Sequence, residues 1–262
     1  MTQHSTVIES KRILVALDTS ARGRAALEAA VRLAMTTHAE LQGLYVDDED
    51  LLRLASLPFA YEIDFPSASP HRLQSVNMER ALRAAAQEAE QAFTKTLQQH
   101  NLKSTFRIVR GTLIGASLAA ADDVDTLVIG QRGRSSRLMA GDQMLRHGVR
   151  KKSVVAVFDG SASALQTIEI ANKLAESNAG ELSILVRSGN GQQRADMCLA
   201  WLRQQRIQAE VNQAMASFSQ AIINYVRTFA PGLLLINRDS QFLNESQISL
   251  IVNEFECPLI LC

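Results

Sequence analysis

Apolar and polar residues follow two patterns along this chain, one typical of buried strands and the other of amphipathic helices. Short apolar runs recur between longer stretches in which apolar residues return every three or four positions. The first run, at 13–17, is closed by Asp18-Thr19-Ser20 and is followed by a helical pattern that extends to about residue 36. Strands alternating with helices in this way predict a parallel sheet that is covered on both faces.

The same reading assigns an element to most of the chain. In the first half it predicts strands at 13–17, 41–46, 105–109 and 126–129, and helices ending near 36, at 78–100, from 111 to about 121, and at about 138–147. In the second half it predicts strands at 154–158, 181–186, 209–213, 233–236 and 258–261, and helices ending near 176, at about 193–204, at 218–228 and at 244–255. Residues 47–75 contain three prolines and are expected to form a long irregular connection, of a kind that is often functional.

The two halves are copies of one unit. When Asp18 is aligned with Asp159, ten of the 27 positions from 18 to 44 are identical to their counterparts, without a gap. Self-similarity at such a long period indicates two copies of one folding unit. A basic stretch at 150–152 lies between them, so we expect one domain at 1–150 and a second at 151–262.

Composition narrows the classes of function. The chain has 262 residues, of which 47% are hydrophobic and 21% charged, which suits packed cores with a polar surface. Its 27 basic and 27 acidic residues cancel, so no basic balance favours nucleic acid or an anionic membrane. Neither a signal sequence nor a membrane-spanning run is visible, and the three cysteines and five histidines lack metal-type spacing. We therefore expect a cytoplasmic protein with reduced thiols and without a metal.

Candidate ligand-binding residues fall at the carboxyl ends of predicted strands in the first half, where open α/β sheets bind ligands. Asp18 and Val46 end the first and second strands, and Gly130-x-x-Gly133 ends the fourth. Glycines allow close approach of the backbone, N–H groups at a helix start attract phosphate oxygens, and Arg132 can add a charge-assisted contact. Asp18 alone is more typical of a helix N-cap, and a single Gly-x-x-Gly is often structural. Their coincidence at one sheet edge favours a binding site.

Several stretches carry a family resemblance: Ile-Leu-Val-Ala-Leu-Asp-Thr-Ser at 13–20, Val-Val-Ala-Val-Phe-Asp-Gly-Ser at 154–161, Leu-Val-Ile-Gly-Gln-Arg-Gly-Arg-Ser at 127–135 and Cys-Pro-Leu-Ile-Leu at 257–261. Through them the chain resembles a tandem universal stress protein. The resemblance implies two doubly wound α/β domains with strand order 3-2-1-4-5. In nucleotide-binding members, the aspartate after strand one and the apolar residue ending strand two hold adenine and ribose, and Gly-x2-Gly-x9-Gly-Ser/Thr holds the phosphates.

The resemblance thus implies an adenine nucleotide, ATP or AMP, as ligand. The residues that would hold it are Ala16, Asp18, Val46, Gly130, Arg132, Gly133 and Gly141. Two features depart from the family motif: seven residues rather than nine separate Gly133 from Gly141, and Asp142 stands where a hydroxyl is expected. A carboxylate close to a polyphosphate costs on the order of 1 kcal/mol or more. ATP, AMP, another nucleotide or none therefore stay open.

The second copy departs further from the motif. It keeps Asp159, but residues 237–241 after its fourth strand contain no glycine, and Arg187 replaces the apolar residue that ends its second strand. We expect a nucleotide in the first half only, and a regulatory role in the stress response rather than dedicated catalysis. The alternatives are an interaction scaffold that binds no nucleotide and a slow ATPase. Protein partners and pairing of the two halves within the chain are expected, and a homodimer stays open.

Counting strands predicts an open sheet edge in the first half. Residues 148–153 are polar and basic, and the apolar run 154–158 already serves as the central first strand of the second copy. The first half is therefore expected to have four strands of its own, with an exposed or borrowed edge beside 126–129. Segments 5–10 and 47–75, or a second chain, are the candidates to cover it.

Overall fold

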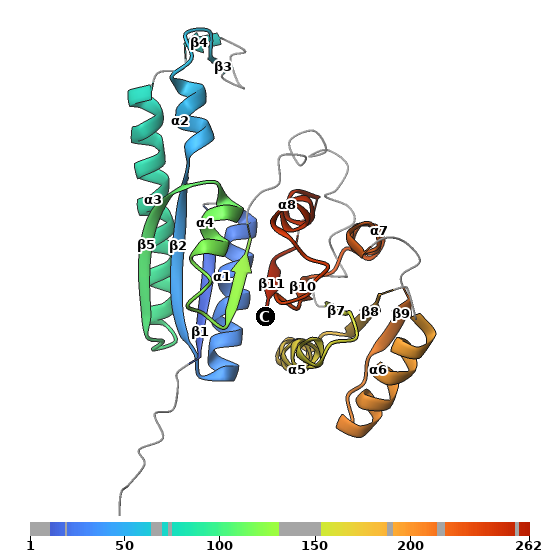
Figure 1. Cartoon of the computed structure of the whole chain (residues 1–262). Coiled ribbons are helices and arrows are strands. Elements are labelled where there is room, and N and C mark those ends of the chain that lie inside the picture. The colour runs from blue at the N-terminus through green and yellow to red at the C-terminus, as the bar shows by residue number, and fades with distance from the viewer. Residues whose placement is uncertain are drawn as a thin grey trace, which may run out of the picture.

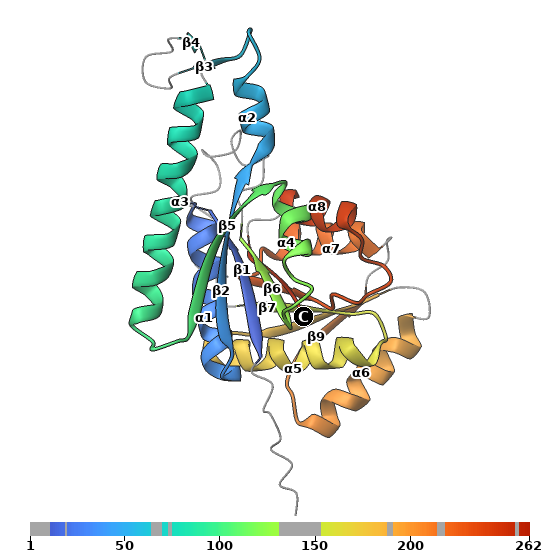
Figure 2. The same ribbon diagram turned by 60° about the vertical axis from the view of Figure 1, so that its left-hand side comes forward.

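A computed structural model describes residues 11–18, 20–63, 70–72, 75–130, 153–187, 191–213, 218–254 and 257–262. Their strands form one nine-stranded sheet with helices on both faces, and a separate two-stranded ribbon (Figures 1 and 2). The predicted domain boundary at residue 150 falls outside the described residues and stays a prediction.

The first half contributes four strands to the large sheet, as predicted, in the order β5-β2-β1-β6. Most predicted elements are confirmed, with ends shifted by a few residues. The elements are β1 (Arg12–Leu17), α1 (Ala21–Thr37), β2 (Glu40–Asp48), α2 (Glu49–Ala55), β3 (Tyr61–Ile63), β4 (Pro70–Arg72), α3 (Ser75–Gln98), β5 (Ser104–Gly111), α4 (Leu113–Ala119) and β6 (Thr126–Ile129). The helix predicted at 138–147 lies outside the described residues.

The second half has five strands in the order β9-β8-β7-β10-β11, which is the predicted order 3-2-1-4-5. Its neighbouring strands are all parallel. The elements are β7 (Val154–Phe158), α5 (Ala162–Ser177), β8 (Leu182–Val186), α6 (Gly191–Gln205), β9 (Glu210–Gln213), α7 (Phe218–Phe229), β10 (Leu233–Ile236), α8 (Glu245–Glu254) and β11 (Leu259–Leu261). As expected, β7 is central, with β10 and β8 on its two sides.

The edge of the first half is borrowed, but from a segment that the sequence did not suggest. β11 pairs with β6 in antiparallel register, with Leu259 opposite Ile129 and Leu261 opposite Leu127. The proposed covers at 5–10, at 47–75 and from a second chain are therefore wrong for this edge. All residues of β6 and β11 are buried, so each strand needs a partner on both sides, and each supplies the other with one.

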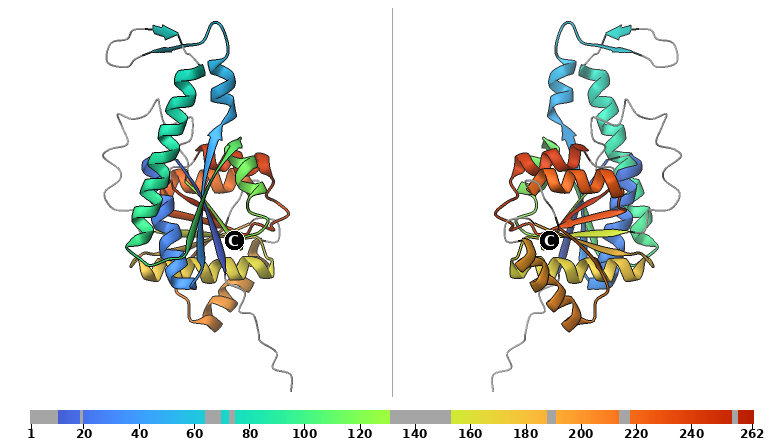
Figure 3. Two further views of the ribbon diagram at one scale, coloured as in Figure 1. Left: turned by 90° about the vertical axis from the view of Figure 1, so that its left-hand side faces the viewer. Right: turned by 90° about the vertical axis from the view of Figure 1, so that its right-hand side faces the viewer.

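Two apolar clusters fill the space between the sheet and its helices, one on each face. The first cluster contains side chains of α1, α3, α5 and α6, and the second contains side chains of α4, α7 and α8. Both clusters take strand residues from both halves, so the core is continuous across the β6–β11 junction. Figure 3 shows these helix layers on the two sides of the twisted sheet.

Residues 47–75 are more regular than predicted. β2 continues to Asp48, whose side chain accepts from the Asp50 N–H and caps α2. Glu49 and Asp50 in the first turn and Arg53 in the last turn complement the helix dipole. α2 packs against α3, and the β3–β4 ribbon lies beyond it, so this segment projects from the body (Figures 1 and 2). Elements of three and seven residues are too short for periodicity to identify.

Candidate functional site

Three of the predicted nucleotide-contacting residues lie side by side at the carboxyl ends of adjacent strands. β1 lies between β2 and β6, and the register places Leu17 opposite Tyr45 and Ala16 opposite Ile129. Asp18, Val46 and Gly130 each come directly after a residue of those pairs. The sheet therefore brings them to one edge, although β2 runs two residues beyond Val46.

The buried members of the predicted set are held by the sheet. Ala16 is 1% exposed within β1 and has Leu44 and Ile129 as its strand neighbours. Val46 is 9% exposed and belongs to the apolar cluster on the α4 face. Arg132, Gly133 and Gly141 lie outside the described residues, and their contact with phosphates stays a prediction.

Asp18 has a structural partner in its own turn. Its Oδ1 accepts from the Ser20 N–H at 3.1 Å and from the Ser20 hydroxyl at 2.5 Å, and Ser20 Oγ accepts from the Gly23 N–H at 3.1 Å. Ser20 is the N-cap of α1. The aspartate thus fixes the residue that caps the helix.

The second half repeats this turn. Asp159 Oδ1 accepts from the Ser161 N–H at 2.9 Å and from its hydroxyl at 2.6 Å, and Ser161 Oγ accepts from the Ala164 N–H at 3.2 Å. Burial by itself would raise the pKa of Asp159, but hydrogen bonding, chiefly from the Ser161 and Ser240 side chains, outweighs it and lowers the pKa. An aspartate in this position therefore has a helix-capping role in both copies and does not by itself mark a ligand site.

An acidic environment surrounds Tyr45 beside Asp18, which sequence reasoning did not identify. Burial first, and then the charges of Asp47, Asp18 and Glu88, raise the pKa of Tyr45 to about 12. Asp47 Oδ1 is buried and has no hydrogen-bond partner among the described residues. A buried acceptor without a donor is unfavourable, so this oxygen suits an N–H or O–H group of a ligand.

In the second half, the position equivalent to Gly130 is occupied by the side chain of Asn237. Asn237 follows β10, as Gly130 follows β6, and is 2% exposed. Its Nδ2 donates to Ser161 Oγ at 3.2 Å and to Ser163 Oγ at 2.9 Å, and its Oδ1 accepts from the Asp239 N–H at 3.1 Å. The amide therefore ties the end of β10 to the start of α5.

A cation–π pair covers the neighbouring strand end. Arg187 follows β8, and its guanidinium carbon lies 3.5 Å from the centre of the Phe242 ring, in the segment after β10. Next to it, Gly160 has a φ of 97°, and a Cβ there would lie 3.0 Å from Arg194 Nε. The carboxyl ends of β7, β8 and β10 are thus closely packed.

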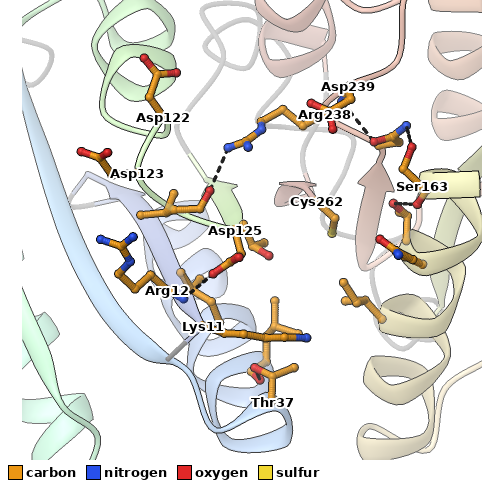
Figure 4. Close-up of a pocket in the computed structure, with 18 residues that line it drawn as sticks. Lys11, Arg12, Thr37, Asp122, Asp123, Asp125, Ser163, Arg238, Asp239 and Cys262 are labelled. Atoms are coloured by element: carbon orange, nitrogen blue, oxygen red, sulfur yellow. Dashed lines mark hydrogen bonds between the residues drawn. The ribbon is translucent and has the colours of Figure 1, made fainter. Parts of the chain in front are cut away.

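A cavity of about 700 Å³ lies beside Asn237, where the two halves meet (Figure 4). It is at the amino end of β1, opposite Asp18, and its walls come from both halves. Arg238 Nη1 donates to the carbonyls of Ala121 at 2.8 Å and Val124 at 3.0 Å. The remaining polar lining includes Lys11, Arg12, Asp122, Asp123, Asp125, Ser163, Gln166 and Asp239. Sequence reasoning missed this junction because it depends on the antiparallel pairing of β6 with β11.

The described ranges contain neither a metal centre nor a membrane-spanning helix. No cluster of His, Cys, Asp and Glu there is arranged to hold a metal ion. None of the helices in those ranges has the length and apolarity needed to cross a membrane.

Comparisons with known proteins agree with this architecture. Among solved structures, the chain is similar to a universal stress protein from Archaeoglobus fulgidus DSM 4304, with 15% identity, coverage of 96% of this chain and 95% of that one, and a TM-score of 0.52. That likeness supports the fold over both halves. A protein of the same family from Burkholderia pseudomallei covers 44% of this chain and 98% of its own, with 13% identity and a TM-score of 0.34.

Universal stress protein UspA from Lactobacillus plantarum is similar over 49% of this chain and 82% of its own, with 23% identity and a TM-score of 0.36. No curated protein matches the chain. The model of the Universal stress protein family matches residues 9–141, which is more than half of the 262 residues. The chain therefore belongs to the universal stress protein family.

Proposed function

We propose that this protein is a stress-response regulatory protein that binds an adenine nucleotide in its first half only, with binding rather than turnover as its role. The observation that carries the proposal is the contrast between the two copies at the residue that follows the fourth strand. That residue is Gly130 in the first half and Asn237 in the second. The two positions are equivalent in the sheet, because β6 pairs with β1 as β10 pairs with β7.

The first half fits a nucleotide at this edge. Gly130 places no side chain at the end of β6, so phosphate oxygens can approach the backbone closely. Two strands away, near the end of β2, the buried Oδ1 of Asp47 has no partner among the described residues and offers an acceptor for an amino or hydroxyl group of the nucleoside. Satisfying such a buried oxygen contributes about 1–3 kcal/mol to binding.

The second half does not fit a nucleotide. The Asn237 amide is already bonded to Ser161 and Ser163, and Arg187 lies on Phe242. A phosphate group placed there would have to break these contacts. Asp18 and Asp159 do not distinguish the halves, since each accepts a hydrogen bond from the serine that caps the following helix. The test therefore exchanges the residues that do differ.

Two reciprocal substitutions form a matched pair: Gly130→Asn and Asn237→Gly. A labelled adenine nucleotide is titrated into the wild type and both variants, and folding of each is checked by circular dichroism. Gly130→Asn should weaken binding at least about tenfold, equivalent to about 1.4 kcal/mol, and Asn237→Gly should leave it unchanged. Loss of binding only in Asn237→Gly would place the site in the wrong half. A wild type that binds no adenine nucleotide would favour the scaffold instead.

A further inference from the structure

The cavity of about 700 Å³ between the two halves has the size of a small-molecule site. Its first-half wall comes from the starts of β1 and β6, the end of α1 and the turn before β6, and its second-half wall comes from α5, the segment after β10 and the end of β11. Figure 4 shows Lys11, Arg12 and Thr37 on the first-half wall and Ser163 on the second-half wall. Ligand sites are common where two folding units meet, because side chains from both can converge there.

Part of the cavity wall belongs to the protein core. Ile13 and Leu33 from the first half are 2% and 1% exposed, and Thr167 from the second half is 1% exposed. Val124 and Thr126 are buried as well. The cavity therefore reaches from the surface to buried side chains, and a ligand in it would lose part of its contact with water.

Hydrogen bonds fix the walls of the cavity. The two bonds from Arg238 Nη1 to the carbonyls of Ala121 and Val124 hold the second-half wall to the first-half wall. Within the first-half wall, Asp125 Oδ2 accepts from the Arg12 N–H at 2.7 Å. Walls that are fixed in advance lose little conformational freedom when a ligand binds, which favours affinity.

The cavity is lined by charged side chains of both signs. Three cationic and four acidic side chains line it, and none of the seven forms an ion pair with another described residue. Charged groups of this kind are available for charge-assisted hydrogen bonds to a ligand. They are Lys11, Arg12, Arg238, Asp122, Asp123, Asp125 and Asp239.

This mixture of charges selects among ligand classes. A nucleotide or another polyanion would be repelled by the four carboxylates, and a polycation by the lysine and the two arginines. A metal ion does not fit, since no cluster of His, Cys, Asp and Glu in the described ranges is arranged to hold one. A small ligand that carries one anionic and one cationic group can pair with both sets.

The second-half wall adds uncharged polar groups. Ser163 and Gln166 on α5 line the cavity together with Asn237. Asn237 Nδ2 donates to Ser163 Oγ at 2.9 Å, which fixes the position of this hydroxyl. The Gln166 amide makes no hydrogen bond to a described residue. Hydroxyl and amide groups can both donate and accept, so this wall suits an uncharged polar group of the ligand.

We infer that the cavity binds a free α-amino acid with an uncharged polar side chain, for which L-glutamine is the probe. Its α-carboxylate pairs with Lys11, its α-ammonium pairs with Asp125 Oδ1, and its side-chain amide bonds to Gln166 on α5. The ligand thus contacts both halves. The inference does not depend on nucleotide binding, because the nucleotide is assigned to the opposite end of the first-half strands.

Isothermal titration calorimetry of the full chain tests the two charges separately. N-acetyl-L-glutamine lacks the ammonium group, and L-glutaminamide lacks the carboxylate. L-glutamine should bind with a Kd below about 1 mM, and each analogue should bind at least about tenfold more weakly. Added AMP should leave the affinity for L-glutamine unchanged, because the carboxylates of the cavity repel phosphate. Competition between AMP and L-glutamine would show a phosphate site and overturn the inference.

Two tryptophan substitutions on α5 test the location. Gln166→Trp fills the cavity from the second-half wall and should weaken L-glutamine binding at least about tenfold. Glu169→Trp is the matched control, since this residue is exposed on the same helix and does not line the cavity. Its affinity for L-glutamine should equal that of the wild type. Circular dichroism checks the folding of both variants.

Lys11→Met serves as a second variant if Gln166→Trp does not fold. The residue is exposed, so the change does not disturb the core. It should weaken L-glutamine binding about tenfold and leave L-glutaminamide binding unchanged, because only L-glutamine has the carboxylate. Equal losses for both ligands would overturn this role of Lys11. No binding of L-glutamine at about 10 mM, analogues that bind as tightly, or a Gln166→Trp variant that binds like the wild type would overturn the site itself.

Discussion

Replacing Arg238 with alanine should loosen the junction between the two halves. Its Nη1 bonds the carbonyls of Ala121 and Val124, which belong to the turn between α4 and β6, while its backbone N–H donates to the Cys262 carbonyl at 2.8 Å (Figure 4). Arg238→Ala removes the two side-chain bonds and leaves the backbone bond in place. The side chain is thus a direct polar tie from the second half to the segment that leads into β6.

The cost follows from the donors and their exposure. A hydrogen bond from a charged group contributes about 1.5–3 kcal/mol. Both bonds come from one nitrogen of a half-buried side chain, so water replaces part of each, and we expect a total loss of about 2 kcal/mol. Because the core is continuous across the junction, this loss should lower the free energy of unfolding of the whole chain. For a protein of this size it corresponds to a fall in Tm of about 4–8 °C.

Urea unfolding measures the effect with two probes. Trp201 is the only tryptophan and lies on α6, so its fluorescence reports the second half, and circular dichroism reports both halves. Arg238→Ala should lower both transitions by the same amount. Arg238→Lys should restore at most part of the lost free energy of unfolding, since an ammonium group lacks the planar set of donors of a guanidinium group. The control is Arg187→Ala, whose contact with Phe242 stays within the second half and should cost about 1 kcal/mol or less. A change below about 0.5 kcal/mol for Arg238→Ala would refute the reasoning.

The remaining predictions concern the core and acid stability. Gly43→Ala should destabilise the fold by about 1–3 kcal/mol in urea unfolding, because the new Cβ would lie 2.4 Å from Phe106 Cδ2 and 3.0 Å from Phe93 Cε2. Adding Phe106→Leu to this variant should recover part of the lost stability. If Gly43→Ala did not change the free energy of unfolding, this account of the packing would be wrong. The lowered pKa of Asp159 gives stability that is present above its unfolded value of 3.8 and is lost as the pH falls through the folded value. Between about pH 6 and about pH 3, the wild type should therefore lose more free energy of unfolding than Asp159→Asn, and equal losses would show that the Ser161 bonds do not stabilise the carboxylate.

Much of the fold could be predicted because the central strands of the sheet are apolar. The runs that became β6 and β10 are buried along their whole length, and a parallel sheet covered on both faces requires this. The repeat then placed β7 at the centre of the second half. α2 and the β3–β4 ribbon were missed because they are too short to show a period. The sequence predicted β11 as a strand but not as the neighbour of β6, because a local pattern identifies a strand and not its partner more than a hundred residues away.

The candidate site was predictable to a similar extent. The sequence placed Asp18, Val46 and Gly130 at adjacent strand ends, and the register agrees. It could not show that Asp18 bonds to Ser20, since the same residues fit a ligand contact or a helix cap. The burial of the Asp47 oxygen without a partner among the described residues is a feature that only the three-dimensional structure gives.

Residues 237–241 take the place of a glycine motif in the second half, and the same segment joins the two halves. Because β11 is antiparallel to β6, the strands of the two halves run in opposite directions, and the carboxyl ends of the second half lie against the amino ends of the first. The segment 237–241 occupies that position. Asn237 ties the end of β10 to the start of α5, and the next residue, Arg238, donates across the junction to the turn before β6. A glycine loop there would offer neither the amide nor the guanidinium. Asp18, Val46 and Gly130 lie at the opposite end of the sheet, where the start of β11 is the described strand end of the second half beside β6. The head-to-tail arrangement therefore gives the strand ends of the second half a role in the junction, and the proposed function assigns the ligand to the strand ends of the first half.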